Sequence, residues 1–227
     1  MFARAIAEYW SAPFAAGAVL FDDGVFRLSA NPGLAADRRV QVLTTGALTH
    51  AVVTPEIASE LGAVASLEEL EAQLGAAELT LNGADNLFYF DPANRPVADA
   101  AVRRLTAADA AAFARFEAAT SEQDRDDAFV ELDHWAVFGA FVDGELVSAA
   151  SAYPWTDSPM ADMGVLTIDS ARGAGHGSRV IRSLSAFAID EGYEPQYRCQ
   201  LDNAASIALA GRAGLSLFGT WDVIESE

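Results

Sequence analysis

The sequence predicts an α+β protein of two domains: a small N-terminal α+β domain over residues 1–95, and a C-terminal domain over residues 99–227 with a mixed, mostly antiparallel sheet flanked by helices. Three observations predict this. Residues 91–96 contain two prolines, which discourage helix and strand and so indicate a linker. After the linker, apolar patterns follow the order β-α-α-β-β-β-α-β-α-β. Within that order, one strand leads into a glycine-rich loop that opens a helix.

Short β-forming runs separated by turn residues predict three hairpins before the linker. The turns are expected at residues 22–24, 44–46 and 82–86. The flanking strands are expected at residues 18–21, 25–28, 40–43, 48–53, 79–81 and 87–90. Two helices are expected between the second and third hairpins, opening after the capping residues Thr54 and Ser66. No catalytic constellation is evident in this half.

The pattern after the linker gives six strands and four helices. The strands are expected at residues 102–105, 134–142, 145–153, 161–168, 196–201 and 215–224. The helices are expected at residues 107–118, 123–132, from the glycine loop to 189, and 204–212. Asp143-Gly144 predicts a hairpin between the second and third of these strands.

The glycine-rich loop is the stretch from Arg172 to Gly177, which reads Arg-Gly-Ala-Gly-His-Gly. Free N–H groups and the positive end of the helix dipole attract an anion at such a helix start. Glycines remove the Cβ atoms that would keep the anion away. Arg172 adds a guanidinium at the entrance of the loop. The stretch therefore predicts a phosphate-binding site.

Three kinds of phosphate loop compete for this stretch. A Walker loop requires a lysine, and the chain contains none. A dinucleotide fingerprint has a different glycine spacing, and only 25 residues follow Asp202, its candidate ribose-binding acid, which is too few for the remaining strands. The third pattern is Arg-x-x-Gly-x-Gly, which Arg172, Gly175 and Gly177 match. It resembles the pyrophosphate loop of the GNAT acyl-CoA N-acyltransferases.

Two further stretches are similar to that family. Thr167-x-Asp169-x-x-Arg172 resembles its approach to the loop, with Asp169 in place of the usual proline. About 30 residues downstream, the segment over residues 200–215 resembles the family's Asn-x-x-Ser-x-x-Leu-Tyr-x-x-x-Gly-Phe element. The resemblance covers roughly residues 102–224. It implies a GNAT fold whose sheet is splayed at a cofactor cleft.

The resemblance also implies a set of cofactor-binding residues. The strand before the loop would offer backbone groups to the pantetheine arm of acetyl-CoA, and one N–H there would stabilise the oxyanion of the tetrahedral intermediate. The loop would hold the pyrophosphate, with His176 contributing its backbone N–H. Asn203 and Ser206 would contact the cofactor or cap the last helix. The implied set is Val165, Leu166, Thr167, Arg172, Gly173, Ala174, Gly175, His176, Gly177, Asn203 and Ser206.

The catalytic residues are not identified by the sequence. Many relatives carry a tyrosine acid in the last helix, but the corresponding residue here is Ala210. Tyr193, Tyr197 or water could replace it, or the CoA thiolate could leave without protonation. The candidate general bases are carboxylates, namely Asp162, Asp157 and Glu131.

Composition excludes several classes of function. The net charge of −19 argues against nucleic acid as a partner. Five arginines and four acids between Arg172 and Arg212 give that segment a charge of +1, which suits an anionic cofactor. Three scattered histidines and one cysteine indicate neither a metal site nor a disulfide framework. The first ten residues lack a signal-peptide layout and no run is long enough to span a membrane, so we expect a soluble cytoplasmic protein.

The function that the resemblance implies is transfer of an acetyl or other acyl group from acetyl-CoA or its analogues to an amine by direct attack. Seven acids and one arginine between Glu117 and Asp133 would favour a cationic amine, on a small molecule or a protein, or would only solubilise a helix face. The N-terminal domain could shape the acceptor site or form a homodimer. The alternative, kept open by Ala210 and the missing base, is a catalytically inactive CoA-binding or regulatory domain.

Overall fold

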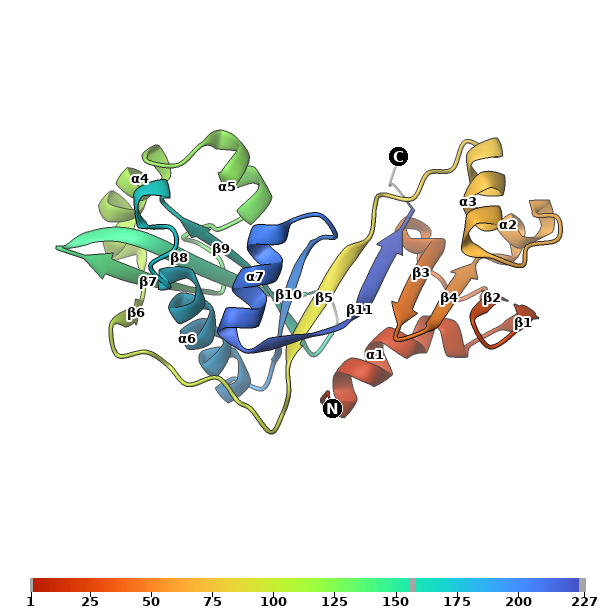
Figure 1. Cartoon of the computed structure of the whole chain (residues 1–227), viewed down its shortest axis with the longest axis horizontal. Coiled ribbons are helices and arrows are strands. Elements are labelled where there is room, and N and C mark those ends of the chain that lie inside the picture. The colour runs from red at the N-terminus through yellow and green to blue at the C-terminus, as the bar shows by residue number, and fades with distance from the viewer. Residues whose placement is uncertain (1, 156–157, 225–227) are drawn as a thin grey trace. The chain divides into compact units, whose positions relative to one another are not determined.

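The computed structural model describes residues 2–155 and 158–224. It divides into two compact units, each of which can be followed in Figure 1. We call the unit of residues 7–87, 199–202 and 217–224 the N-terminal unit, and the unit of residues 2–6, 88–198 and 203–216 the C-terminal unit. Among the described helices, none is long and apolar enough to cross a membrane.

The boundaries of these units differ from the expected ones at residues 95 and 99. Strand β5 (Asp85–Phe90) passes from the N-terminal to the C-terminal unit, and β11 (Leu215–Val223) passes back. The reason is strand pairing: residues 220–223 of β11 pair antiparallel with residues 41–44 of β3 (Val40–Thr45). The end of the chain therefore belongs to the unit that the sequence pattern assigns to the first 95 residues.

The strands of the N-terminal unit lie in the order β1-β2-β4-β3-β11. β1 (Ala18–Asp22) and β2 (Phe26–Ala30) form the first expected hairpin, and β3 and β4 (Leu48–Val53) form the second. β2 and β4 are parallel. Helices α2 (Pro55–Glu60) and α3 (Leu67–Ala76) cover the sheet, and their buried side chains join one apolar core with those of the strands.

Two features of this unit differ from the sequence prediction. The third hairpin is wrong: Leu81 makes only an isolated bridge to Ile224, and β5 pairs elsewhere. Helix α1 (Arg4–Ala15) was not predicted, although Ile6, Trp10 and Phe14 recur every four residues and are buried. Such spacing is the ordinary signature of one helix face, and Pro13 within it does not end the helix.

The strands of the C-terminal unit lie in the order β5-β10-β9-β8-β7-β6, which is mixed and mostly antiparallel, as expected. Its elements after β5 are β6 (Val102–Arg104), α4 (Ala110–Ala118), α5 (Glu122–Ala128), β7 (Ala136–Val142), β8 (Glu145–Pro154), β9 (Met160–Thr167), α6 (His176–Asp190), β10 (Glu194–Gln200) and α7 (Ala204–Ala213). With β11 they confirm the predicted order of strands and helices. Within this unit, β9 and β10 are the only parallel neighbours among the strand pairs of the described residues whose register is known.

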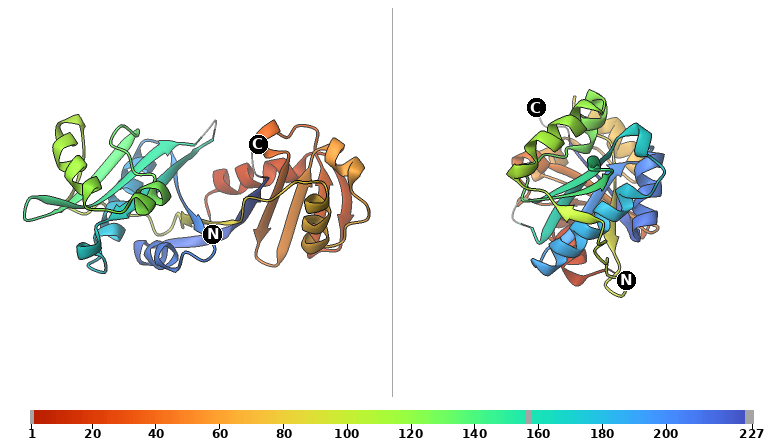
Figure 2. Two further views of the ribbon diagram at one scale, coloured as in Figure 1. Left: turned by 90° about the horizontal axis from the view of Figure 1, so that it is seen from above. Right: turned by 90° about the vertical axis from the view of Figure 1, so that its left-hand side faces the viewer.

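Helices cover both faces of this sheet (Figure 2). On one face, Phe113 and Phe116 of α4 pack in an apolar cluster with Leu166 of β9. On the other face, the hydroxyl of Ser185 in α6 lies 3.3 Å from the sulfur of Met163 in β9. Successive side chains of a strand point to opposite faces. Even-numbered residues of β9 therefore face α4 and α5, and odd-numbered residues face α6.

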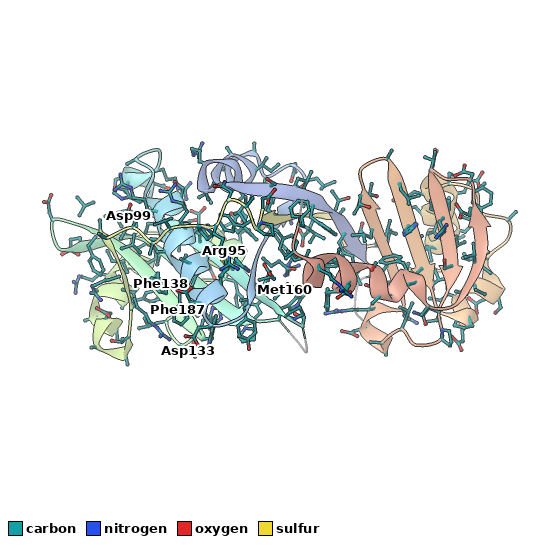
Figure 3. All side chains as sticks on the ribbon, turned by 90° about the horizontal axis from the view of Figure 1, so that it is seen from below. Arg95, Asp99, Asp133, Phe138, Met160 and Phe187 are labelled. Atoms are coloured by element: carbon teal, nitrogen blue, oxygen red, sulfur yellow. The ribbon has the colours of Figure 1, made fainter. Side chains whose placement is uncertain are left out.

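Two other segments of the unit hold helix α6 along its length (Figure 3). Phe187 lies against Phe138 of β7, with ring centroids 5.6 Å apart. The backbone N–H of Asp99 donates to the hydroxyl of Ser183 at 2.9 Å, and its carboxylate lies 3.7 Å from Arg179. The segment after the linker is thereby fixed along the helix.

We expect Leu184→Ala to destabilise the C-terminal unit by about 2–5 kcal/mol, because Leu184 is fully buried in α6 and its truncation leaves a cavity. Asp190→Ala, an exposed position at the end of the same helix, is the matched control and should change stability by about 0.5 kcal/mol or less. Urea unfolding of both variants measures the difference. Equal unfolding midpoints would contradict the assigned packing of α6.

Candidate functional site

The strands β9 and β10 pair only along part of their length. Their parallel register runs from Met160 opposite Glu194 to Met163 opposite Tyr197. Both strands continue beyond this last pair, β9 to Thr167 and β10 to Gln200, without further pairing to each other in the described residues. The sheet therefore opens beside the end of β9, at the place expected to be splayed.

The backbone of β9 offers hydrogen-bonding groups to this opening. Ile168 N–H donates to Val147 at 3.1 Å and Met160 C=O accepts from Trp155 at 2.9 Å, so even-numbered residues bond across to β8. In an antiparallel pair the alternate residues point their N–H and C=O groups the other way. The N–H and C=O of Val165 therefore point toward the side from which β10 has separated.

The glycine loop adopts backbone conformations that favour glycine. Gly173 and Gly175 have φ values of +79° and +83°. A Cβ atom on either would meet nothing within 4 Å, so the space above them is open. Gly177 is different, because a Cβ there would lie 2.7 Å from Leu209 of α7 and 3.4 Å from the Thr167 hydroxyl. Two glycines shape the loop, and the third brings α6 close to β9 and α7.

Gly175 is the N-cap of α6 and has no side chain that could accept a hydrogen bond from the first turn. The first four N–H groups of a helix have no partner within it. Those of His176, Gly177 and Ser178 thus lie at the positive end of a helix of 15 residues. Gly173 and Ala174 are exposed, and His176 is half-buried. This is an anion-binding geometry made by the backbone.

The guanidinium of Arg172 forms ion pairs with two carboxylates. Its Nη2 lies 3.0 Å from Asp124 of α5, and its Nε lies 3.1 Å from Asp169 and donates to the carbonyl of Thr167 at 3.2 Å. The Ser121 hydroxyl and then Arg172 lower the pKa of Asp124. A phosphate at the loop would compete with Asp124 for this guanidinium.

Asn203 was expected to contact the cofactor or to cap the last helix, and it caps α7. Its side-chain oxygen accepts from the Ser206 N–H at 3.0 Å. The residue at the family's tyrosine position, Ala210, is fully buried. The two tyrosines considered as substitutes for that acid make aromatic contacts: Tyr193 packs against Trp135, and Tyr197 packs against Phe88.

Asp162 is not free to act as a base. It is buried, and its two carboxylate oxygens accept from Gln196 at 2.9 Å, from Arg198 Nε at 3.1 Å and Nη2 at 2.9 Å, and from the Tyr153 hydroxyl at 3.1 Å. Burial, followed by the charge of Asp162, raises the pKa of Tyr153 to about 12. Asp162 and Arg198 form a bidentate ion pair between the neighbouring strands β9 and β10.

Of the other two candidate bases, Asp157 lies outside the described residues. Glu131 is exposed, and its carboxylate lies 4.0 Å from Nε2 of His134. His134 belongs to a cluster that sequence reasoning missed: its Nδ1 lies 2.8 Å from the Ser151 hydroxyl, and its ring contacts those of Phe129 and Tyr153. Ser151 is on a neighbouring strand 17 residues away, so no local pattern could have indicated it.

The described residues contain no group of three or more His, Cys, Asp or Glu side chains arranged to hold a metal ion. The acids of α5 make separate contacts instead. Asp124 pairs with Arg172, and Asp127 accepts from Gln123 at 2.8 Å.

Comparisons with known proteins bear on this site. Residues 104–215 match the family model described as Acetyltransferase (GNAT) family. No curated protein is significantly similar to the chain in sequence. Among solved structures, a putative acetyltransferase of the GNAT family from Novosphingobium aromaticivorans has a TM-score of 0.51 and 17% identity, covering 98% of this chain and 95% of that one.

Two other similar structures cover less. A GNAT-family acetyltransferase from Colwellia psychrerythraea has a TM-score of 0.49 and 20% identity over 71% of this chain, which spans 64% of that protein. An aminoglycoside N-acetyltransferase in complex with CoA has a TM-score of 0.41 and 18% identity, over 52% of this chain and 92% of that one.

We expect Asp162→Ala to destabilise the protein by about 3 kcal/mol or more, because it removes the carboxylate from a half-buried guanidinium. Asp127→Ala, which removes an exposed carboxylate, should change stability by about 0.5 kcal/mol or less. Thermal unfolding of both variants makes the comparison. A variant of Asp162 as stable as the wild type would mean that the ion pair with Arg198 is not structural.

Proposed function

We propose that this chain, whose residues 104–215 form a domain of the GNAT acetyltransferase family, moves an acetyl group from acetyl-CoA to the primary amine of a small molecule or a protein. The family assignment implies an acyltransferase. The observation that best supports the finer proposal is the open N-terminus of α6 beside the unpaired end of β9. The helix N-terminus suits the diphosphate of CoA, and the unpaired backbone N–H and C=O groups of β9 suit its pantetheine arm.

In this proposal the diphosphate of CoA binds the backbone amides at His176, Gly177 and Ser178. Support comes from the positive φ of Gly175 and from the open space above it, since a Cβ there would meet nothing within 4 Å. Gly173 and Ala174 would line the same turn. Arg172 would supply a guanidinium after exchanging the carboxylate of Asp124 for a phosphate oxygen.

The pantetheine arm would run along the free edge of β9. The C=O and N–H of Val165 point toward that edge, and Leu166 and Thr167 complete the part of β9 that does not pair with β10. With the thioester at this edge, the N–H of Val165 would donate to the carbonyl oxygen as negative charge develops on it. The amine nitrogen attacks the carbonyl carbon, the C–N bond forms, and the C–S bond breaks to release the CoA thiolate.

No side-chain acid is required to complete this reaction in the proposal. Ala210 carries no hydroxyl, and a thiolate is a stable enough leaving group to depart and take a proton from water. The acceptor is a cationic amine, which the acids Glu131 and Asp133 would attract before one proton is lost. A homodimer is one assembly that such a chain could form, and nucleic acid and membranes are not among the partners proposed.

Two observations favour a second candidate, a CoA-binding or regulatory domain without turnover. Asp162 is occupied by four hydrogen bonds, and α7 lacks a tyrosine at residue 210. The two candidates are separated by following the release of free thiol from acetyl-CoA with a panel of primary amines. Turnover favours the enzyme, and CoA binding without turnover on any amine favours the second candidate.

We expect Gly175→Asp to weaken CoA binding by at least about tenfold, because it places a carboxylate within a few ångströms of the diphosphate. Gly175→Asn is the matched control, since asparagine has the same shape and tolerates a positive φ but carries no charge. Calorimetric titration with CoA measures both variants. If aspartate and asparagine weaken binding equally, or if neither does, the diphosphate is not held by this turn.

We expect Asp124→Asn to strengthen CoA binding by about two- to fivefold, because it removes the carboxylate that competes for Arg172. Asp127→Asn makes the same change in net charge on the same helix without touching Arg172, and should leave the affinity as it is. Pantetheine, which lacks the diphosphate, should bind both variants like the wild type. A gain for Asp127→Asn of the same size would point to net charge alone.

A further inference from the structure

We propose that His134 is the general base of the acyl transfer, accepting at Nε2 the proton that the cationic acceptor amine must lose before it attacks. This rests on the proposed acyltransferase function. It also locates the amine between Glu131 and His134, on the face of the sheet that carries α4 and α5.

The first step concerns how His134 is held. Its Nδ1 lies 2.8 Å from the Ser151 hydroxyl oxygen, which is almost fully buried and also accepts from the Glu131 N–H at 3.3 Å. A serine oxygen has two lone pairs. The hydrogen bond to Ser151 thus orients the ring and leaves Nε2 as its outer nitrogen, near Glu131. In this proposal the neutral imidazole carries its proton on Nδ1, with the Ser151 oxygen as its acceptor, so that Nε2 carries the lone pair that takes the proton of the amine.

The second step concerns what faces Nε2. The carboxylate of Glu131 lies 4.0 Å away, and the side chain of His134 is 12% exposed. A negative charge at that distance stabilises the imidazolium that forms when the amine gives up its proton. The other groups against the ring are Phe129, at 4.9 Å between centroids, and Tyr153, at 5.2 Å. Tyr153 stays neutral near pH 7, because the pKa of its hydroxyl is about 12.

The third step places His134 near the reacting end of the cofactor. Ser151 is paired directly with Gly164 on β9, so both lie on one face of the sheet at neighbouring positions. Gly164 has no side chain because a Cβ there would lie 1.9 Å from the carbonyl oxygen of Ala128. The next residue, Val165, carries the N–H proposed for the oxyanion. The end of α5 therefore lies against β9 at Gly164, one residue before the proposed thioester edge, and His134 contacts the residue of β8 that pairs with Gly164.

The shape around His134 also suits an amine attached to an apolar group. Phe129 is 51% exposed although it is a large aromatic residue, and its ring contacts those of His134 and Tyr153. An aromatic face beside a carboxylate attracts a cation and also an apolar substituent. Glu131 would hold the ammonium group, and Phe129 would contact the carbon skeleton.

The alternatives to His134 are weaker proton acceptors. Both oxygens of Asp162 already accept hydrogen bonds, two of them from a guanidinium. Imidazole is the side chain that exchanges protons near neutral pH, and His134 supplies it beside the carboxylate of Glu131. We therefore assign Glu131 to positioning and His134 to proton transfer.

The protons and electrons of the reaction then balance. The ammonium group gives one proton to Nε2, and the freed lone pair forms the C–N bond to the thioester carbon. Collapse of the tetrahedral intermediate breaks the C–S bond, and the electron pair leaves on the CoA sulfur. The nitrogen loses its second proton to water, and the thiolate takes one back. The imidazolium returns its proton to solvent.

The test uses the full chain with acetyl-CoA and two amine probes, 2-phenylethylamine and spermidine. We expect His134→Gln to lower kcat/KM by about 100-fold or more and to abolish the acid limb of its pH profile, with CoA affinity and melting temperature unchanged. His134→Ala should regain activity when imidazole is added. His50→Ala, which removes a histidine from the N-terminal unit, should show no dependence on imidazole.

The outcomes separate two failures. If the wild type turns over either amine and His134→Gln keeps its rate and its pH profile, His134 is not the base and the acyltransferase proposal stands. A loss of rate with an unchanged pH profile and no imidazole rescue would also overturn the assignment, by making His134 structural. If the wild type binds CoA but acetylates neither probe, the proposed function fails for these amines and the assignment of a base to it fails with it.

Discussion

The pairing of β9 with β10 ends at Met163 and Tyr197, and the proposed cofactor site depends on that ending. The next residue of β10, Arg198, turns back to the Asp162 carboxylate on the last paired stretch. A bidentate ion pair thus lies at the point where the two strands separate. Beyond it, no strand among the described residues pairs with this edge of β9, and a β-strand edge can bind an extended chain through its backbone groups. The same ion pair removes Asp162 from the candidate bases.

The second constraint concerns how an acidic protein without lysine would hold the proposed anion. The net charge is −19, so acidic side chains outnumber the basic side chains that could bind a phosphate. Backbone amides at the start of α6 carry no such penalty, because their dipole is fixed by the helix and their approach is opened by glycine. Arg172, the nearest guanidinium, is already shared with Asp124 and Asp169. The anion site therefore depends on conformation more than on charge.

The sequence predicted what is encoded locally. Strand and helix periods gave the order of elements from β6 to β11, and the spacing of Arg172, Gly175 and Gly177 located the turn before α6. Interactions between distant residues were not predictable in this way. Asp162 and Arg198 are 36 residues apart, and their spacing in the sequence does not indicate that they form an ion pair. Helix α1 is a different case, because Ile6, Trp10 and Phe14 carried a readable helical spacing.

In the proposed function, the amides at the start of α6 and the free edge of β9 bind one CoA molecule. The most direct measurement is the change in amide chemical shifts of ¹⁵N-labelled protein on titration with CoA. The account predicts that the largest shifts fall at His176, Gly177 and Ser178 and at Val165, and that pantetheine moves only the last of these. Shifts confined to other parts of the chain, with the α6 amides unmoved at saturating CoA, would contradict it.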